Sequence, residues 1–428
     1  MTDSNLLERR QKLLGAAYQL FYDNPVHLVR GEGVWLYDAD GRKYLDMYNN
    51  VPHVGHCHPH VVSAICEQAA KLNTHTRYLH ENVLDYAERL TAKFSDELDT
   101  AMFCCTGSEA NELALRIART VTGAEGMIVT DFAYYGNTKA IREISTEDCP
   151  ADERPPYVVS VPAPDCYRGR YRGADAGERY AAHVQEAIDT LADRGIGPAA
   201  FIVDTIISSD GVVAPPAGYL KRAADIVHAA GGLFVADEVQ PGFGRTGSHF
   251  WGFEADGSKP DIVTMGKPMG NGHPIAAVVT RGEMASAFSK ADGYFNTFGG
   301  NPVSCAAALA VLDVIENENL QQNALDTGQH IANGLMSLAE NHEVIGDVRG
   351  NGLFIGVELV TDRDERTPAT SFAQRLVNDL RDRGVLTGLI GPDDNILKLR
   401  PPMVLQASDA DFMLGILDES LAALAINM

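Results

Sequence analysis

The sequence predicts an α/β protein in which a mostly parallel sheet is covered on both faces and is joined to a smaller α+β domain. Short apolar runs alternate with helical segments through the middle of the chain, as strands alternate with crossover helices. The runs that we interpret as strands are 127–130, 158–161, 200–203, 233–236, 262–265 and 275–279. In such sheets the ligand binds at the carboxyl ends of the strands.

The ends of the chain carry different patterns. Leucines and alanines at helical spacing predict an amphipathic helix over residues 4–22, and two alternating runs about Asp40 and Gly41 predict a hairpin over 33–47. Helices are expected at about 176–194, at 218–229 and from Pro59 onward. After residue 303, two long helical patterns precede alternating segments at 344–359 and 397–402 and a last helix at about 408–426, which predicts a small α+β domain.

The composition narrows the choice of partners and of compartment. Lys and Arg number 35 against 58 Asp and Glu, so the formal net charge of −23 argues against nucleic acid and anionic membranes as partners. An anionic substrate must therefore meet a local cluster of basic residues. The seven cysteines form no CxxC pair, and the N-terminus has no signal-peptide core, which indicates free thiols and a cytoplasmic protein. A length of 428 residues predicts about two or three domains.

The stretch from residue 231 to 274 carries the chemistry. The run 233–236 ends in Asp237 and Glu238, and the run 262–265 leads to Lys267. Two neighbouring strand ends therefore present a carboxylate and an amine to one crevice. An amine can form a Schiff base with an aldehyde cofactor, and a carboxylate can hold a pyridinium proton, so this pair suits pyridoxal 5′-phosphate (PLP).

Each of these signals has an ordinary explanation when it is taken alone. A single lysine is usually a solvated charge, and a carboxylate after a strand is often a helix cap. Histidines at 53, 56, 58 and 60 suggest a metal site, but no helical i, i+4 pair with a carboxylate accompanies them. We therefore predict no metal and retain only His53, as a candidate substrate contact.

The spacing of several motifs resembles one known family. Asp237-Glu-Val-Gln240, the glycine-rich run from 242 to 247 and Lys267 beyond Pro260-Asp261 are similar to the signature of class III PLP-dependent aminotransferases, and the resemblance covers nearly the whole chain. It implies the PLP-dependent transferase fold of type I. It further implies that Lys267 is the Schiff-base lysine and proton shuttle, that Asp237 pairs with the pyridine nitrogen and that Gln240 lies near the phenolic oxygen.

The resemblance extends to the rest of the cofactor site. Gly107 and Ser108, at the start of a helical stretch, match the cup for the cofactor phosphate, and Tyr134 matches the aromatic residue that stacks on the ring. Thr297 matches a threonine that reaches the cofactor of the neighbouring subunit, which implies a homodimer with shared active sites and leaves a tetramer open. The family also implies domains of 1–59 and 311–428, which together form the small domain, and of 60–310, which binds PLP.

Two positions depart from the family pattern. Tyr135 stands where relatives have histidine, and Asp204 stands where relatives commonly have glutamate. The resemblance implies that both positions adjoin the cofactor, and no family role is carried over to them.

Four stretches make the chain most similar to the ethanolamine-phosphate phospho-lyase subgroup: 49–59, 72–82, 162–172 and 264–274. That resemblance implies that phosphate is eliminated from O-phosphoethanolamine, leaving acetaldehyde and ammonia. A fork of N–H donors suits a phosphate dianion. The candidate substrate contacts are Arg77 first and Arg400 second, with Asn50, His53 and Tyr18 in support; the alternative for Arg77 is an ion pair with Glu81.

Three other functions stay open at this point. The chain could be a true aminotransferase, either alanine–glyoxylate-like or acting on ω-amines. It could be a lyase for a larger phospho-amine such as 5-phosphohydroxylysine. It could also be a catalytically silent PLP-binding protein, although Lys267, Asp237 and the phosphate cup are all present.

Overall fold

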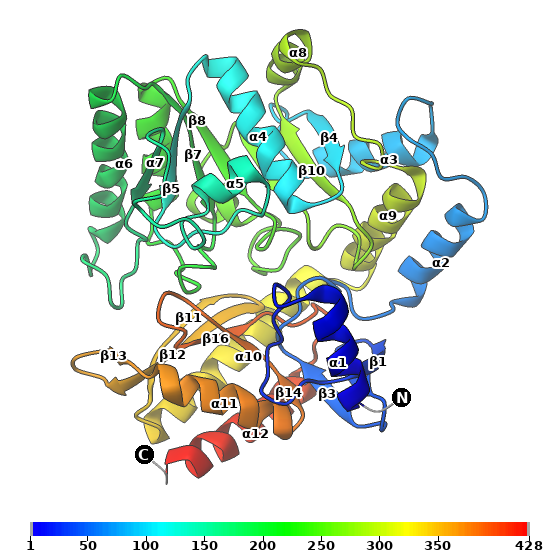
Figure 1. The fold of residues 1–428 in the computed structure, drawn as a ribbon, viewed down its shortest axis with the longest axis vertical. Helices are drawn as coiled ribbons and strands as arrows, with labels where there is room; N and C mark the ends of the chain where they lie inside the picture. The colour runs from blue at the N-terminus through cyan, green and yellow to red at the C-terminus, as the bar shows by residue number, and fades with distance from the viewer. Residues whose placement is uncertain (1–2, 426–428) are drawn as a thin grey trace.

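The computed structural model describes residues 3–425, with side chains from residue 5 onward, and Figure 1 shows two bodies stacked along its long axis. The upper body contains a seven-stranded sheet in the order β4-β10-β9-β8-β7-β5-β6. Its strands are β4 (Thr100–Cys104), β5 (Gly126–Thr130), β6 (Val158–Val161), β7 (Pro198–Asp204), β8 (Leu233–Asp237), β9 (Ile262–Met265) and β10 (Ala276–Thr280). β10 runs antiparallel to both of its neighbours, and the other pairs are parallel. The prediction of a mostly parallel sheet is confirmed.

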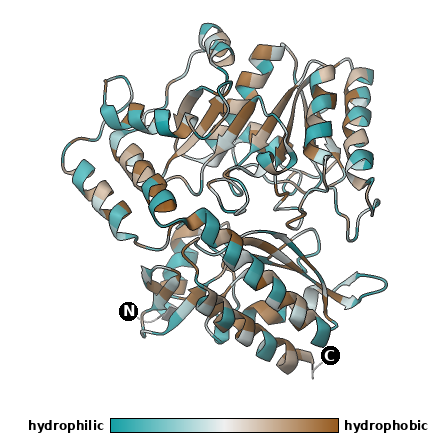
Figure 2. Ribbon diagram, turned by 180° about the vertical axis from the view of Figure 1, so that it is seen from behind, coloured by the Kyte–Doolittle hydropathy of each residue, from teal (hydrophilic) through white to brown (hydrophobic). Residues whose placement is uncertain are grey.

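Helices cover both faces of this sheet. The helices of the upper body are α2 (Pro59–Ala69), α3 (Glu81–Thr91), α4 (Gly107–Thr122), α5 (Lys139–Ile144), α6 (Ala176–Asp193), α7 (Tyr219–Ala229), α8 (Gly282–Ala291) and α9 (Pro302–Asn317). Within β5, Met127 and Val129 pack in the cluster around α4, whereas Ile128 packs in the cluster around α6 and α7. Alternate residues of one strand are thus buried on opposite faces, which is why the strand is apolar without interruption. Figure 2 shows the hydrophobic strands between helices that turn hydrophilic faces outward.

The lower body joins the two ends of the chain. β14 (Val385–Leu386) pairs in parallel with β3 (Lys43–Asp46), in one sheet with β1 (Leu28–Glu32) and β2 (Trp35–Asp38). A second sheet runs β11 (Ile345–Asn351), β12 (Phe354–Asp362), β16 (Ile396–Leu399) and β15 (Gly388–Ile390), with β13 (Thr367–Pro368) paired to β12. Its helices are α10 (Leu320–Asn341), α11 (Thr370–Asp382) and α12 (Ala407–Ala425). The expected α+β character is present, while the three domain ranges stay a prediction.

The first helix is shorter than the sequence suggested. α1 spans Asp3–Leu14 rather than 4–22. Gly15 follows it with a φ of +67°, a left-handed conformation that glycine adopts at no steric cost and that ends a helix. The chain then runs without regular structure to β1. The last helix agrees with its expected range up to Ala425, and residue 426 lies outside the described residues.

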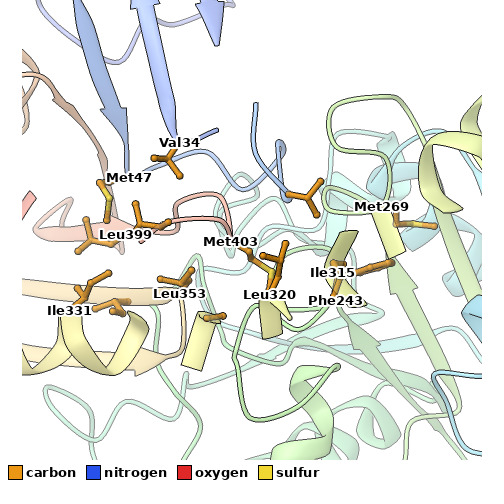
Figure 3. Packing of buried hydrophobic residues seen from close by; sticks show 14 of the residues in the cluster. Val34, Met47, Phe243, Met269, Ile315, Leu320, Ile331, Leu353, Leu399 and Met403 are labelled. Carbon is orange, nitrogen blue, oxygen red and sulfur yellow. The ribbon is translucent and has the colours of Figure 1, made fainter. Parts of the chain in front are cut away.

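One hydrophobic cluster continues from the upper body into the lower body. Figure 3 shows Phe243 and Met269 at one end of this cluster, Val34 and Leu399 at the other, and Met403 between them. Continuous burial of this kind fixes the two bodies against each other. The carboxyl ends of β7 and β8 meet at the edge that faces the lower body, where Asp204 is the register partner of Asp237.

Candidate active site

A cavity of about 240 Å³ opens at the carboxyl ends of β7, β8 and β9. Six of the sequence-predicted cofactor residues line it: Gly107, Ser108, Tyr134, Asp237, Gln240 and Lys267. Asn111, Tyr135, Gly136, Asp204 and Val239 complete the wall. A second cavity of about 180 Å³ shares Gly107 and Lys267 with the first. The structure therefore brings most of the predicted cofactor set to one hollow.

The first turn of α4 forms one wall of the cavity. Thr106 and Glu109 form a capping box, in which the Thr106 hydroxyl accepts the Glu109 N–H at 3.2 Å and the Glu109 carboxylate accepts the Thr106 N–H at 3.1 Å. This box leaves the N–H groups of Gly107 and Ser108 to a ligand. Because the positive end of the helix dipole lies at the same place, the turn suits a phosphate group.

Asp237 lies on the floor of the cavity and is buried. Its Oδ2 accepts the Asn111 side-chain N–H at 3.0 Å, and its Oδ1 accepts the Val239 N–H at 2.9 Å. Burial, and then the neighbouring Asp204 carboxylate, raises the pKa of Asp237 to about 7. A cation facing the carboxylate would reverse this shift, because an opposite charge favours the ionised form.

Lys267 lies beside this carboxylate on the loop after β9. Burial, and then the positive charge of Arg400, lowers the pKa of Lys267 to about 8, while Asp237 and Asp204 act in the opposite direction. A lysine whose pKa is lowered in this way has a substantial neutral fraction near neutral pH. Neutral amine is the form that attacks a carbonyl carbon.

A chain of hydrogen bonds links the cavity to the lower body. The Ser208 hydroxyl donates to Asp204 Oδ2 at 2.5 Å and accepts from Gln240 Nε2 at 2.7 Å. Arg400 Nη1 donates to Gln240 Oε1 and, at 3.0 Å, to Asn50 Oδ1. The guanidinium also lies over the Tyr48 ring, 4.4 Å from its centroid. Two of the predicted substrate contacts, Arg400 and Asn50, are therefore adjacent to the cavity.

The comparisons with known proteins agree with this geometry. The family model for class III aminotransferases matches residues 18–421. The chain belongs to the class III aminotransferase family. Among relatives, an "alanine–glyoxylate aminotransferase 2-like" protein of Drosophila melanogaster is 46% identical, over 97% of this chain and 86% of its own length. An "ethanolamine-phosphate phospho-lyase homolog 1" of Caenorhabditis elegans is 42% identical, over 93% and 89%.

Solved structures of class III enzymes superpose on almost the whole chain. A phospholyase from Arthrobacter in complex with phosphoethanolamine is 46% identical, with a TM-score of 0.93 and coverage of 97% of this chain and 99% of that one. An amine transaminase from an uncultivated Pseudomonas species, solved in its PLP-bound form, is 31% identical, with a TM-score of 0.86 and coverage of 94% and 95%. The expected type I fold is confirmed, and the cofactor of this class III enzyme is PLP.

The residues of the cavity fit PLP. The free N–H groups of Gly107 and Ser108 suit its phosphate, Asp237 suits its ring nitrogen, and the Lys267 amine suits its aldehyde. The Asn111 Oδ1 atom is buried without a hydrogen-bond partner in the described part of the chain. The cavity wall therefore contains an acceptor that can take a hydrogen bond from a ligand. We propose these roles, together with stacking by Tyr134, for this member of the class III family.

The two departures from the class III pattern are built into the wall. The Tyr135 hydroxyl donates to the Ile202 carbonyl at 2.9 Å, and the Tyr135 carbonyl accepts from Asn111. The Asp204 carboxylate accepts the N–H groups of Ile206 and Ser208 at 3.0 and 3.1 Å. Tyr135 is thus bonded to β7, and Asp204 holds the turn after that strand.

Three other predicted contacts lie away from this cavity, and a fourth is enclosed by protein. Arg77 and Thr297 are exposed on loops of one surface, where the Arg77 guanidinium lies 3.9 Å from the centroid of the Phe295 ring. Tyr18 is exposed on the segment after α1. His53 is buried, and its two ring nitrogens lie 2.9 Å from the Phe243 carbonyl and 3.1 Å from Arg245 Nη2.

The other histidines of the same segment have separate partners. His56 pairs with Asp46, His58 with Glu318 and His60 with Asp313. Over residues 5–425, no group of three or more potential ligands could hold a metal ion. These histidines therefore join the segment to its neighbours. Arg77 forms no ion pair with Glu81 within the same range.

Lys398 is a charged residue of the site that the sequence interpretation missed. It lies on β16 two positions before Arg400, so both side chains leave the same face of the strand. Burial, and then the charge of Arg400, lowers the pKa of Lys398 well below its usual value, and Lys267 acts in the same direction. The alternation Leu397-Lys-Leu-Arg400 could have indicated this residue, because it places two cations on the same side of an extended chain.

Proposed function

We propose that the chain is a PLP-dependent phospho-lyase that converts O-phosphoethanolamine and water to acetaldehyde, ammonia and phosphate. The observation that carries this proposal is a pair of buried cations, one on β16 and one directly after it. Lys398 and Arg400 are 3% and 6% exposed, and neither forms an ion pair with a carboxylate in the described part of the chain. In a chain with a net charge of −23, such cations point to an anionic ligand.

Two buried donors beside these cations support the same ligand. Arg400 Nε and Asn50 Nδ2 have no hydrogen-bond partner in the described residues. A buried donor without a partner costs about 1–3 kcal/mol, so a phosphate that accepts from both would relieve that cost. We assign the phosphate of the substrate to this corner, opposite Lys267.

The names of two relatives point in the same direction. One is an ethanolamine-phosphate phospho-lyase homologue, and another is a phospholyase solved with phosphoethanolamine. Bound PLP supplies a sink for the electrons that are left when a proton is removed from the carbon bearing the substrate nitrogen. Lys267 removes that proton, and Asp237 keeps the ring nitrogen protonated and the sink effective.

Arg77 and Thr297 extend the proposal to a second copy of the chain. They occupy one surface, which also exposes Tyr78, Leu79 and Phe298 at 66%, 96% and 70%. Exposed apolar side chains in such a group are typical of an interface. We propose a homodimer in which Arg77 reaches the substrate phosphate, and Thr297 the cofactor phosphate, in the partner's site. Tyr18 remains a proposed supporting residue, whereas both ring nitrogens of His53 already have protein partners.

The proposed compartment is the cytoplasm. All seven cysteines are free thiols, as expected in a reducing compartment. Across residues 3–425, no helix combines the length and the apolar character needed to span a membrane.

A class III aminotransferase is the second candidate, because a relative with an alanine–glyoxylate aminotransferase-like name is 46% identical. A comparison of kcat/KM values decides between them. We expect phosphate release from O-phosphoethanolamine to exceed transamination between alanine and glyoxylate at least about 100-fold, because a phosphate dianion matches two buried cations in charge whereas a carboxylate carries a single charge. A preference for the alanine–glyoxylate pair would overturn the proposal.

A further inference from the structure

Lys398 is enclosed by protein without a partner for its charge. Its side chain is 3% exposed, and Nζ lies 5.7 Å from the centroid of the Phe354 ring. Within residues 5–425, Nζ makes no hydrogen bond and no ion pair. A buried ammonium group in this position is destabilising unless a ligand completes its surroundings. The side chain is therefore poorly explained by a structural role alone.

The charged groups around Lys398 come from four segments. Arg400 follows β16, Lys267 follows β9, Asp204 ends β7 and Glu147 follows α5. Neither carboxylate lies within 4 Å of Nζ. Asp204 already accepts hydrogen bonds from Ser208 and Ile206. Asp204 and Lys267 both line the cavity, so the charge of Lys398 is coupled to groups of the cavity wall and to a second cation, Arg400.

The proposed elimination needs an acid at this corner. It breaks the bond between carbon and the ester oxygen, and the electron pair leaves with that oxygen. Without a proton, the departing group would be fully deprotonated phosphate, a strong base and a poor leaving group. A proton delivered to the ester oxygen as the bond breaks lets phosphate leave as hydrogen phosphate, which is general acid catalysis.

We propose that Lys398 is this acid: its ammonium group donates a proton to the ester oxygen of the departing phosphate. The inference rests on the proposed phospho-lyase function. Lys267 takes one proton from the carbon, the electrons of that C–H bond form a carbon–carbon double bond as the C–O bond breaks, and Lys398 gives one proton to the oxygen. The two-carbon fragment then takes up water and leaves as acetaldehyde and ammonia, while solvent restores both lysines.

Arg400 is unsuited to the same task. A guanidinium group does not lose its proton in proteins, whereas the pKa of an amine falls readily in a buried, positively charged environment, so the amine gives up its proton more easily. Burial, Arg400 and Lys267 lower the pKa of Lys398 in this way. The two residues therefore have different roles: Arg400 binds the phosphate, whereas Lys398 both binds and protonates it.

The test compares Lys398→Arg with the unchanged protein on two substrates. O-Phosphoethanolamine needs a proton on its leaving group, whereas O-sulfoethanolamine releases sulfate, which is a very weak base. Arginine keeps the positive charge but cannot donate the proton. We expect K398R to lower kcat for phosphate release at least about 100-fold and to change kcat for sulfate release less than about 3-fold. R400K serves as the matched control, because it should raise KM for both esters and leave the ratio of their kcat values unchanged.

A second measurement requires no turnover. In a ³¹P NMR titration of the holoprotein with inorganic phosphate, the affinity of the unchanged protein should fall as pH rises through the pKa of Lys398. K398R should keep its affinity to higher pH, because its guanidinium remains charged. Equal losses of kcat on both esters, no loss on either, or identical pH dependence of phosphate binding would each contradict the proposal.

Two further outcomes can be told apart: K398R fails to fold, or the unchanged protein shows no phospho-lyase activity. If K398R does not fold, the pH dependence of kcat in the unchanged protein decides: phosphate release must fall at high pH where sulfate release does not, and parallel profiles would refute the acid role. If the unchanged holoprotein releases no phosphate from O-phosphoethanolamine, the proposed function fails. The phosphate titration then still reports whether Lys398 carries the proton that governs anion binding.

Discussion

At the scale of single residues, the site contains buried carboxylates and buried cations close to one another. Asp204 and Asp237 are register partners at the ends of two strands, while Lys267, Lys398 and Arg400 oppose them. Each group shifts the pKa of its neighbours in a direction that its burial and charge explain. The pH dependence of cofactor uptake therefore reports on this arrangement.

Uptake of PLP by the apoprotein should quicken as pH rises, with a midpoint near 8. The reason is that the neutral amine of Lys267 reacts, and the pKa of this lysine is lowered to about 8 by burial and Arg400. Arg400→Met removes a repelling charge, so the pKa rises and the midpoint moves to higher pH. The measurement is the rate of change in cofactor absorbance between about pH 6 and 10. Arg30→Met, which alters an exposed arginine on β1, should leave the midpoint in place; an unshifted midpoint in R400M would contradict the account.

Arg77→Ala should raise KM for O-phosphoethanolamine about 10-fold or more, because one charge-assisted contact to phosphate is lost. Bound-cofactor absorbance should stay intact, since Arg77 lies outside the cofactor cavity of its own chain. Arg116→Ala offers a matched control, because Arg116 pairs with Asp292 on the surface. A KM equal to that of the unchanged protein would remove Arg77 from the substrate site.

Motif spacing was sufficient to predict six residues that line one cavity, but it could not predict the partners of individual side chains. Lys267, Asp237 and Gln240 line the cavity because each lies at or just beyond the end of a strand. His53 was a plausible substrate contact by its neighbours in sequence, yet its ring nitrogens meet Phe243 and Arg245, nearly two hundred positions away. Such long-range contacts leave no local pattern in the sequence.

At the scale of elements, α4 is the helix that matters most for the cofactor. Its capping box fixes the first turn, and the same turn offers the N–H groups of Gly107 and Ser108. Strands were predicted well because they are apolar without interruption and bounded by turns. The end of α1 was not, because its amphipathic spacing continues past Gly15 although the backbone turns left-handed there.

Thr106→Ala should lower the free energy of unfolding by about 1 kcal/mol, which is the usual cost of a lost N-cap. It should also weaken PLP binding several-fold, because the phosphate turn loosens. Thr122→Ala is the matched control at the other end of α4, where the hydroxyl donates to the Ala118 carbonyl at 2.8 Å. Urea unfolding and PLP titration measure both effects. If T106A and T122A bind PLP equally, the capping box does not support the phosphate site.

At the scale of the whole molecule, the two bodies are joined by buried ions as well as by the apolar cluster. Glu358 on β12 is fully buried and accepts a hydrogen bond from Arg349 Nη1 at 2.6 Å. It also forms an ion pair with Arg168, which belongs to the upper body. Arg349 also donates to the Gly211 carbonyl at 2.8 Å, in the loop after Asp204. This network connects the small sheet to the edge of the active site.

Glu358→Ala should lower the free energy of unfolding by about 3–5 kcal/mol, because it leaves two arginines without their buried partner. Asp393→Ala removes a partly exposed partner of the same Arg168 and should cost less than about 1 kcal/mol. Chemical denaturation of both variants as holoproteins gives the comparison. Similar losses in the two variants would contradict a dependence on burial.

The central claim is that this class III enzyme eliminates phosphate rather than exchanging an amino group. The measurement that tests it most directly counts phosphate released per active site when the holoprotein meets O-phosphoethanolamine without any keto acid, while the absorbance of the cofactor is followed. The account predicts many phosphates per site, an equal amount of acetaldehyde and a cofactor that stays in its aldehyde form. No phosphate release, with the cofactor stopping in its amine form until pyruvate or glyoxylate is added, would contradict it and identify an aminotransferase.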